Sequence, residues 1–174
     1  MLQTYILWVA PANLNPMTIK FPPLPPDVEF EVLPKTISAL NEAFDAKRDA
    51  MGPHIEKRWG WDEEFQYTVH KNRFSEKPFV RIIRNDERIG VVSVFSTKKH
   101  IQFGEFYLAQ QHRGNGLGSR ILKHCLSQTD KMNLPVKLEF LKWNPVGSLY
   151  LRHGFEIVGE NDVHYFMERL LNTV

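Results

Sequence analysis

The chain has 174 residues, of which 43% are hydrophobic, 24% charged and 12% aromatic, a composition typical of a folded globular domain rather than a disordered or fibrous chain. Its 22 Lys and Arg residues nearly balance 20 Asp and Glu residues and are scattered, which argues against a nucleic-acid partner. Cys125 is the single cysteine, which excludes a disulfide framework and a multi-cysteine zinc site and favours a reducing, cytoplasmic setting. The apolar stretch at residues 5–10 is too short to span a bilayer, so we expect no membrane partner.

The first 26 residues contain six prolines, each of which removes a backbone donor and restricts the residue before it. We interpret residues 1–26 as a proline-rich extension that precedes a single domain over residues 27–174. Three alternatives stay open for this extension: a peripheral arm, a start-site artefact with the true start at Met17, or a strand-like piece at residues 18–21.

Alternating apolar and acidic residues at 28–33 predict a half-buried strand. A helix should follow, capped by Thr36 or Ser38 and stopped at residues 52–53, where Gly is followed by Pro. Asp62 is placed to cap a second helix. Strands at 79–84 and 88–97 then form a hairpin around the turn residues Asn85 and Asp86.

A third strand at 101–108 leads into a glycine-rich loop and then a helix with an apolar stripe that includes Cys125. Residues 136–141 read as a buried strand, and Asn144 and Pro145 open a short helix that ends at Gly154. Two last strands are expected at 155–158 and 163–167. This order predicts an α/β (α+β) domain around one central sheet.

The loop at residues 111–118 has glycines at positions 114, 116 and 118 immediately before a helix. Unsatisfied amides and the helix dipole favour a phosphate at such a place. A nucleotide P-loop is excluded because Ser119 and Arg120 stand where Lys and Ser or Thr are needed. The glycine spacing also differs from the pattern of a dinucleotide site.

What remains, Gln111-x-x-Gly114-x-Gly116, is similar to the acyl-CoA loop of the GNAT N-acetyltransferase superfamily. Thirty residues after Gly114, the segment 144–155 resembles that family's Asn-x-x-Ala-x-x-Leu-Tyr-x-x-x-Gly-Phe pattern, with Gly147 in place of the usual Ala. The resemblance extends over residues 28–169. It implies the GNAT-type acyl-CoA N-acyltransferase fold, with a mixed, splayed sheet of six to seven strands flanked by about four helices.

The resemblance further implies that acetyl-CoA is the co-substrate, without a metal, and lies between two splayed strands with its pyrophosphate on the loop amides. Its pantetheine would follow the strand that ends at Leu108, where a free amide could stabilise the oxyanion, and the smaller Gly147 would leave it room. Asn144 is sufficiently explained as a helix cap and by resemblance also contacts the pantetheine. Arg113 is favoured over Arg120 as an additional phosphate contact. The expected cofactor-binding residues are Leu108, Gln111, Arg113, Gly114, Asn115, Gly116, Leu117, Gly118, Ser119, Asn144 and Tyr150.

By resemblance, Tyr150 is the general acid that protonates the departing thiolate; the alternative is an aromatic core residue. A carboxylate should serve as base for the attacking amine. We place Glu105 before Glu64 for this role, because strand alternation puts Glu105 on one face with Phe103 and Tyr107. Each carboxylate could instead be an ordinary surface charge.

Trp59 and Trp61 with the acidic residues 62–64 suggest an acceptor mouth for a cationic amine, with Trp59, Trp61, Glu64 and His164 as acceptor-binding residues. Cys125 is interpreted as a core residue, so direct attack in a ternary complex is expected. The leading hypothesis is an N-acetyltransferase that acts on a primary amine of a small molecule or peptide. The alternative is a non-catalytic acyl-CoA-binding sensor or interaction module of the same fold. A homodimer is common by family analogy.

Overall fold

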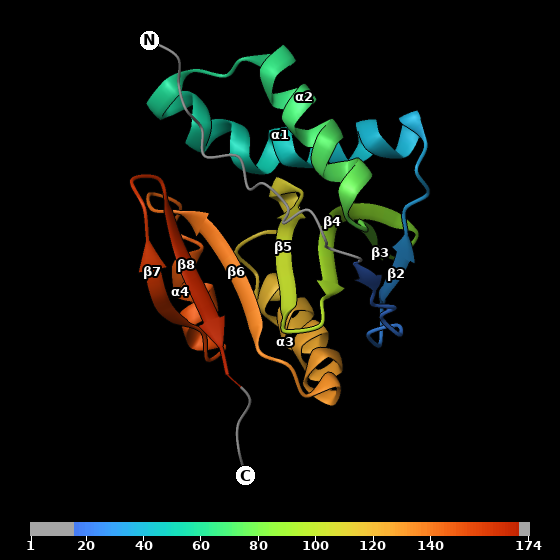
Figure 1. Ribbon diagram of the computed structural model, residues 1–174. Helices are drawn as coiled ribbons and strands as arrows, with labels where there is room; N and C mark the ends of the chain where they lie inside the picture. The colour runs from blue at the N-terminus through green and yellow to red at the C-terminus, as the bar shows by residue number, and fades with distance from the viewer. Residues whose placement is uncertain (1–15, 171–174) are drawn as a thin grey trace.

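The computed structural model describes residues 16–170, which form one sheet with helices on both sides (Figure 1). The strands are β1 (Met17–Thr18), β2 (Val28–Val32), β3 (Val80–Arg84), β4 (Glu87–Ser96), β5 (Ile101–Leu108), β6 (Val136–Leu141), β7 (Glu156–Glu160) and β8 (His164–Arg169). The helices are α1 (Ile37–Trp59), α2 (Glu63–Glu76), α3 (Leu117–Thr129) and α4 (Gly147–Arg152), with short 3-10 turns at Gln110–His112 and Asp130–Met132.

The main path of the sheet is β2-β3-β4-β5-β6-β8-β7, and β1 pairs with the far end of β4. Neighbours are antiparallel except β5 and β6, which are parallel. In Figure 1, α1 and α2 lie across the upper ends of the strands, whereas α3 and α4 lie behind the sheet. The predicted mixed sheet with four helices is confirmed, and β1 adds one strand to the expected six to seven.

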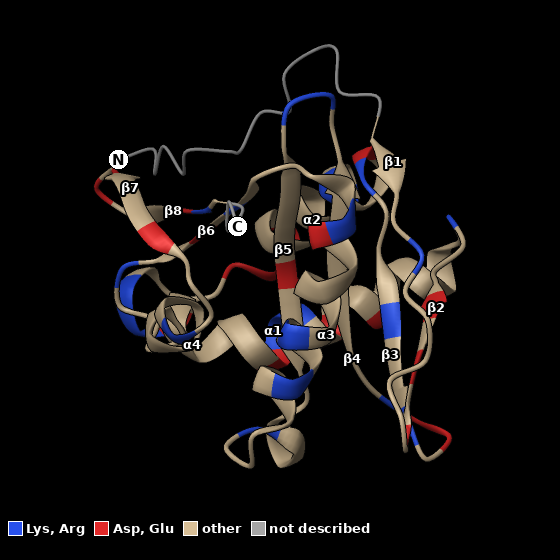
Figure 2. Cartoon of the chain, turned by 90° about the horizontal axis from the view of Figure 1, so that it is seen from below, with Lys and Arg blue, Asp and Glu red and all other residues tan. Residues whose placement is uncertain are grey.

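Two apolar clusters fill the faces of the sheet. The larger cluster packs the stripe of α3, including Cys125, against β4, β5 and β6, while a smaller one packs α1 and α2 against the other face. Burial raises the pKa of the Cys125 thiol to about 12, which agrees with its interpretation as a core residue. Lys and Arg residues are interspersed with Asp and Glu along the helices and strands (Figure 2). No helix within residues 16–170 is long and apolar enough to cross a membrane.

The described part of the N-terminal extension packs against the domain. Ile19 and Phe21 are buried in the larger cluster, and the ring of Phe21 lies 5.6 Å from that of Phe30 on β2. Strand β1 pairs Met17 and Thr18 with the end of β4. The strand-like alternative holds only in part, because β1 comprises Met17–Thr18 and shares one residue with the expected 18–21. Residues 1–15 lie outside the described part of the chain.

Local signals predicted the helix starts well, but one helix end was wrong. The side chain of Thr36 accepts a hydrogen bond from the amide of Ala39 (3.3 Å), and Asp62 caps α2 by accepting from the amide of Phe65 (3.0 Å). However, α1 continues through Pro53 to Trp59 and ends at Gly60, which has φ of 79°. Ile55, which follows the proline, is buried, so tertiary packing of this part of α1 outweighs the cost of a proline inside the helix.

Candidate active site

The site begins where β5 and β6 separate. Their pairing is confined, among the described residues, to Ile101 with Val136 and Gln102 with Lys137. Beyond these pairs the two parallel strands diverge, as Figure 1 shows. The C-terminal ends of β5 and β6 are thus the two splayed strands that the resemblance predicted.

A bulge on β5 shapes this splay. The register with β4 shifts between Val91, which pairs with Tyr107, and Ser93, which pairs with Gly104, so β5 contains one additional residue. Glu105 adopts a left-handed φ of 50° within the bulge, an uncommon conformation for a residue with a side chain. The bulge interrupts the alternation: Phe103 belongs to the cluster on the α3 face and Tyr107 to the cluster under α1 and α2. The expectation that these two rings share a face was wrong.

Glu105 is the centre of a buried charge cluster. One carboxylate oxygen lies 3.1 Å from both the Arg73 guanidinium of α2 and the ammonium of Lys77, which follows that helix directly. The other oxygen accepts from the hydroxyl of Tyr107. Burial alone would raise the pKa of Glu105, but the charges of Lys77 and Arg73 hold it well below its usual value of 4.5. Glu105 is therefore ionised and already satisfied by three partners.

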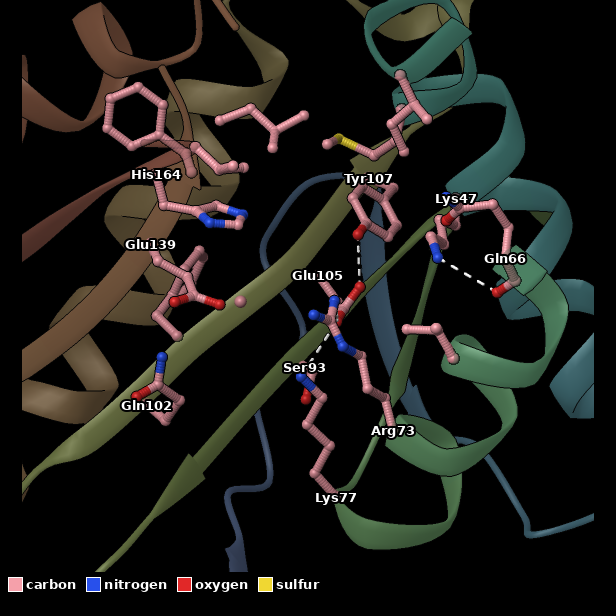
Figure 3. A pocket seen from close by; sticks show the side chains of 18 of the residues that line it. Lys47, Gln66, Arg73, Lys77, Ser93, Gln102, Glu105, Tyr107, Glu139 and His164 are labelled. Carbon is pink, nitrogen blue, oxygen red and sulfur yellow. Dashed lines mark hydrogen bonds and ion pairs between the residues drawn. The ribbon is translucent and has the colours of Figure 1, made fainter. Parts of the chain in front are cut away.

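A cavity of about 150 Å³ opens beside this cluster, between α1, α2 and the splayed strands (Figure 3). Lys47, Gln66, Arg73, Glu139 and His164 line it together with Glu105 and Tyr107. Lys77, Ser93, Gln102 and Gly104 also line it, and the apolar residues of the wall are Met51, Ile55, Trp59, Phe65, Val69, Phe95, Phe103, Phe140, Leu141 and Val163. An engineered cavity of roughly this volume holds a benzene molecule, so the space suits a small acceptor head group.

Glu139 is a second cavity carboxylate, which the sequence analysis missed. It is half-buried on β6, forms no ion pair with a described residue, and points into the cavity near His164 (Figure 3). Burial raises the pKa of Glu139 above 4.5, against the opposing charges of Arg73 and Lys77. Burial and then Arg73 lower the pKa of His164 to about 4, so this imidazole is neutral at pH 7. A glutamate between the apolar residues Leu138 and Phe140 of a strand was the signal that could have identified Glu139.

Only part of the predicted acceptor mouth lines the cavity. Trp59 does, with its ring edge-on to Trp143 at 4.8 Å, whereas the Trp61 indole packs near Phe44 and donates to Glu63. The acidic residues have other partners or positions. Asp62 caps α2, Glu63 is bound by Arg48, and Glu64 is exposed outside the cavity wall. The carboxylates that face the cavity are Glu105 and Glu139 instead.

The glycine loop precedes α3 as predicted. Gly114 and Gly116 have φ of 80° and 83°, and a Cβ at either position would meet no atom within 4 Å. Left-handed backbone beside open space is the form expected where a loop must let a phosphate approach closely. Gln111 lies in the preceding 3-10 turn, and Gly118 and Ser119 lie in the first turn of α3, where backbone amides point outward. The Asn115 side chain already accepts from the amide of Leu117 (3.2 Å).

The basic residues of this region have protein partners. Arg113 donates to the carbonyl of Leu108 (2.6 Å) and pairs with Asp49 of α1, while Arg120 pairs with Asp27. The hydrogen bond from Arg113 to Leu108 thereby connects the loop to the end of β5. A phosphate contact by Arg113 remains a prediction and would require sharing or exchanging these bonds.

Tyr150 of α4 is buried among the rings of Phe103, Phe140 and Phe155, whose centroids lie 5.8 to 6.4 Å away. Burial raises the pKa of its phenol, which therefore stays protonated. Tyr150 is thus an aromatic core residue, as the alternative interpretation held. Its role as the general acid stays a prediction. Tyr150 does not line the cavity.

The turn before α4 differs from the expectation. Asn144 does not cap α4 as expected: its side chain accepts from the amide of Val146 (3.0 Å) in the preceding turn, and the helix begins only at Gly147, with Val146 as its N-cap residue. A Cβ at Gly147 would lie 2.6 Å from the ring of Phe140. The Phe140 ring therefore explains the missing methyl group at this position, and room for the pantetheine stays a prediction.

The structure has an open sheet with one splayed parallel pair and a glycine loop that leads from the splayed strand into a helix. These are features of the acyl-CoA N-acyltransferase fold that the resemblance implied. Residues 75–157 match the family model described as an acetyltransferase (GNAT) domain, which confirms the GNAT resemblance. This part of the chain is therefore similar to an acetyltransferase domain. A comparison with curated proteins finds no sequence match.

Solved structures show the same fold at low sequence identity. The PaiA N-acetyltransferase of Thermoplasma acidophilum, in complex with coenzyme A, superposes with a TM-score of 0.60 at 17% identity, covering 82% of this chain and 99% of that one. The ribosomal-protein-S18-alanine N-acetyltransferase of Escherichia coli gives 0.61 at 14%, covering 84% and 96%. An acetyltransferase of Streptococcus agalactiae gives 0.60 at 16%, covering 83% and 98%.

Proposed function

We propose that the protein transfers the acetyl group of acetyl-CoA to a primary amine of a small molecule or peptide, by direct attack in a ternary complex. The observation that carries this proposal is the half-buried, unpaired carboxylate of Glu139, which faces a small cavity beside the splayed strands. An amine at Glu139 would lie next to the gap in which the resemblance places the thioester. Cys125, buried with a raised pKa, is unsuited to form an acyl-enzyme, which favours direct attack.

Acetyl-CoA supplies its acetyl group as a thioester, and the remaining roles belong to the chain. The loop residues Gln111, Arg113 to Ser119 and Asn144 would hold the cofactor, chiefly through backbone amides at the start of α3. The backbone amide near Leu108, at the end of the splayed strand, would stabilise negative charge on the carbonyl oxygen.

Proton transfer is assigned to two side chains, Glu139 and Tyr150. Glu139 accepts the proton that an ammonium must lose before its nitrogen attacks, and its raised pKa suits this task better than that of an ordinary carboxylate. The new C–N bond forms as the C–S bond breaks, and Tyr150 protonates the departing thiolate. The nitrogen releases its second proton to solvent, and solvent returns a proton to the Tyr150 phenolate, so that one proton is released in each turnover. Glu105, the first predicted base, is held by Arg73 and Lys77 and is better placed to position α2 against β5.

Exposed Glu64 is the least suited of the three carboxylates, because a base needs to reach the amine in the cavity. The neighbour from Escherichia coli acts, by its description, on a ribosomal-protein alanine, which illustrates a peptide acceptor on this fold. We expect a cytoplasmic protein.

The rival function, a non-catalytic acyl-CoA-binding module, makes a different prediction in one assay. The protein is incubated with acetyl-CoA and a panel of primary amines, and release of the CoA thiol is followed with a thiol reagent. Acetyl transfer predicts release that depends on the acceptor and is suppressed in Glu139→Gln. Stabilisation by CoA without release under any acceptor would refute the proposed function and favour the binding module.

A further inference from the structure

Lys47 of α1 is buried in the cavity wall without a carboxylate partner. Its residue is only 4% exposed, and the ammonium makes one long hydrogen bond, 3.4 Å, to the backbone carbonyl of Gln66. No carboxylate of the described residues lies within the 4.0 Å of an ion pair. An ammonium carries three donors, so most of its hydrogen-bonding capacity is unmet by residues 16–170.

Such a group is costly unless something compensates it. Burial lowers the pKa of Lys47 to about 8, which still leaves it mostly charged at pH 7. The nearby carboxylate of Glu105 opposes this shift, but its ion pairs are made with Arg73 and Lys77. A buried ammonium of this kind is satisfied when a ligand brings a negative group.

The distribution of charge across the cavity indicates how such a ligand would be oriented. Figure 3 shows Lys47 and Gln66 on one side of the cavity and Glu139 with His164 on the other, with Glu105 and Tyr107 between them. The cavity is lined by three cationic side chains, Lys47, Arg73 and Lys77, and by the two carboxylates Glu105 and Glu139. Glu105 forms ion pairs with Arg73 and Lys77. One side of the cavity is thus left cationic and the other anionic.

We infer that the acceptor is a primary amine that also carries a carboxylate, bound with its amine at Glu139 and its carboxylate at Lys47. This inference rests on the proposed function, because it names the substrate class for the same site. Apolar side chains of the cavity wall, Met51 and Val69 among them, would contact the carbon chain that joins the two ends. Lys47 acts here as a specificity-determining residue and takes no part in the proton transfers.

Lys47 is tested with matched acceptors and a matched variant. The acceptors are ω-aminoalkanoic acids with one to six methylene groups, each compared with its own carboxamide. Lys47→Met removes the charge and keeps an unbranched apolar stem. The control is Lys57→Met, which removes an exposed lysine of the same helix.

For the wild-type protein, kcat/KM of the best acid should exceed that of its amide by about ten- to hundredfold, the range expected for one charge-assisted contact. Lys47→Met should bring this ratio to within about twofold of one, mainly through a higher KM for the acid, with turnover of the amide retained. Lys57→Met should behave as wild type. Equal use of acid and amide by the wild type, or an equal loss for both in Lys47→Met, would overturn the inference.

A binding measurement separates this inference from the proposed function. The melting temperature of the CoA-bound protein is recorded with each acid and amide, and binding of CoA to Lys47→Met serves as the folding control. If CoA is released with none of the acceptors, the proposed function fails, and the melting temperatures alone then decide the inference. Stabilisation by the acid that Lys47→Met abolishes would still support carboxylate binding, whereas equal stabilisation by acid and amide would overturn it.

Discussion

Replacing Glu105 by Gln should destabilise the domain strongly while keeping its shape. The carboxylate is buried and lies 3.1 Å from both Arg73 and Lys77, so the neutral amide leaves two cations in the interior without their counter-ion. Removing one partner of a buried ion pair costs about 3–5 kcal/mol. Because a domain is stable by only about 5–15 kcal/mol, this loss is a large share of the total.

The effect is measured by urea unfolding followed by circular dichroism, with no ligand present. The matched control is Glu76→Gln, an exposed change at the end of α2, the helix that carries Arg73, which should stay within about 0.5 kcal/mol of wild type. In a double-mutant cycle with Lys77→Met, the coupling energy should exceed about 0.5 kcal/mol. A loss below about 1 kcal/mol for Glu105→Gln, with no coupling, would refute the reasoning.

The pH dependence of stability gives the same cluster a second test. Lys77 and Arg73 hold the pKa of Glu105 well below 4.5, although burial alone would raise it. A depressed folded-state pKa contributes stability that is complete above the unfolded-state pKa of about 4.5 and is lost as the pH falls through the folded-state pKa. Unfolding free energy measured between pH 7 and pH 3 should therefore fall less steeply in Glu105→Gln than in wild type.

Three further changes test the catalytic and structural assignments. Glu139→Gln should lower turnover by about 10²- to 10⁴-fold with unchanged affinity for acetyl-CoA. In the wild-type protein, kcat/KM should rise as the pH increases through the raised pKa of Glu139. Unchanged turnover in Glu139→Gln would show that Glu139 is not the base. Tyr150→Phe should lower turnover while calorimetric binding of acetyl-CoA stays nearly intact, and full turnover would leave this ring only its core role. Gly147→Ala places a Cβ 2.6 Å from the Phe140 ring and should cost about 1–3 kcal/mol in urea unfolding, less when combined with Phe140→Leu; a neutral effect would contradict the close packing.

Local sequence signals predicted much of the fold because their causes are local. Thr36 and Asp62 cap their helices through bonds to amides three residues away. Asn85 and Asp86, with φ of 49° and 64°, make the hairpin turn expected of these residue types. The glycine loop was predicted for the same reason, since left-handed backbone before a helix requires specific residues.

The site's electrostatics depend on contacts between distant parts of the chain. Glu105 meets Arg73 and Lys77 across 32 and 28 positions, a pairing that no spacing rule predicts. The bulge at Glu105 also shifts the alternation along β5, so faces assigned from a period of two were wrong beyond it. Glu139 was missed because its importance comes from burial beside the cavity rather than from a motif.

Direct detection of product tests the central claim most closely. The protein is incubated with acetyl-CoA carrying a ¹³C-labelled acetyl group and a mixture of amines that includes the ω-aminoalkanoic acids, and products are identified by mass spectrometry. The account predicts a labelled N-acetyl amine that forms in proportion to released CoA and is strongly reduced in Glu139→Gln. Absence of any labelled N-acetyl product, in protein shown to bind acetyl-CoA, would contradict it.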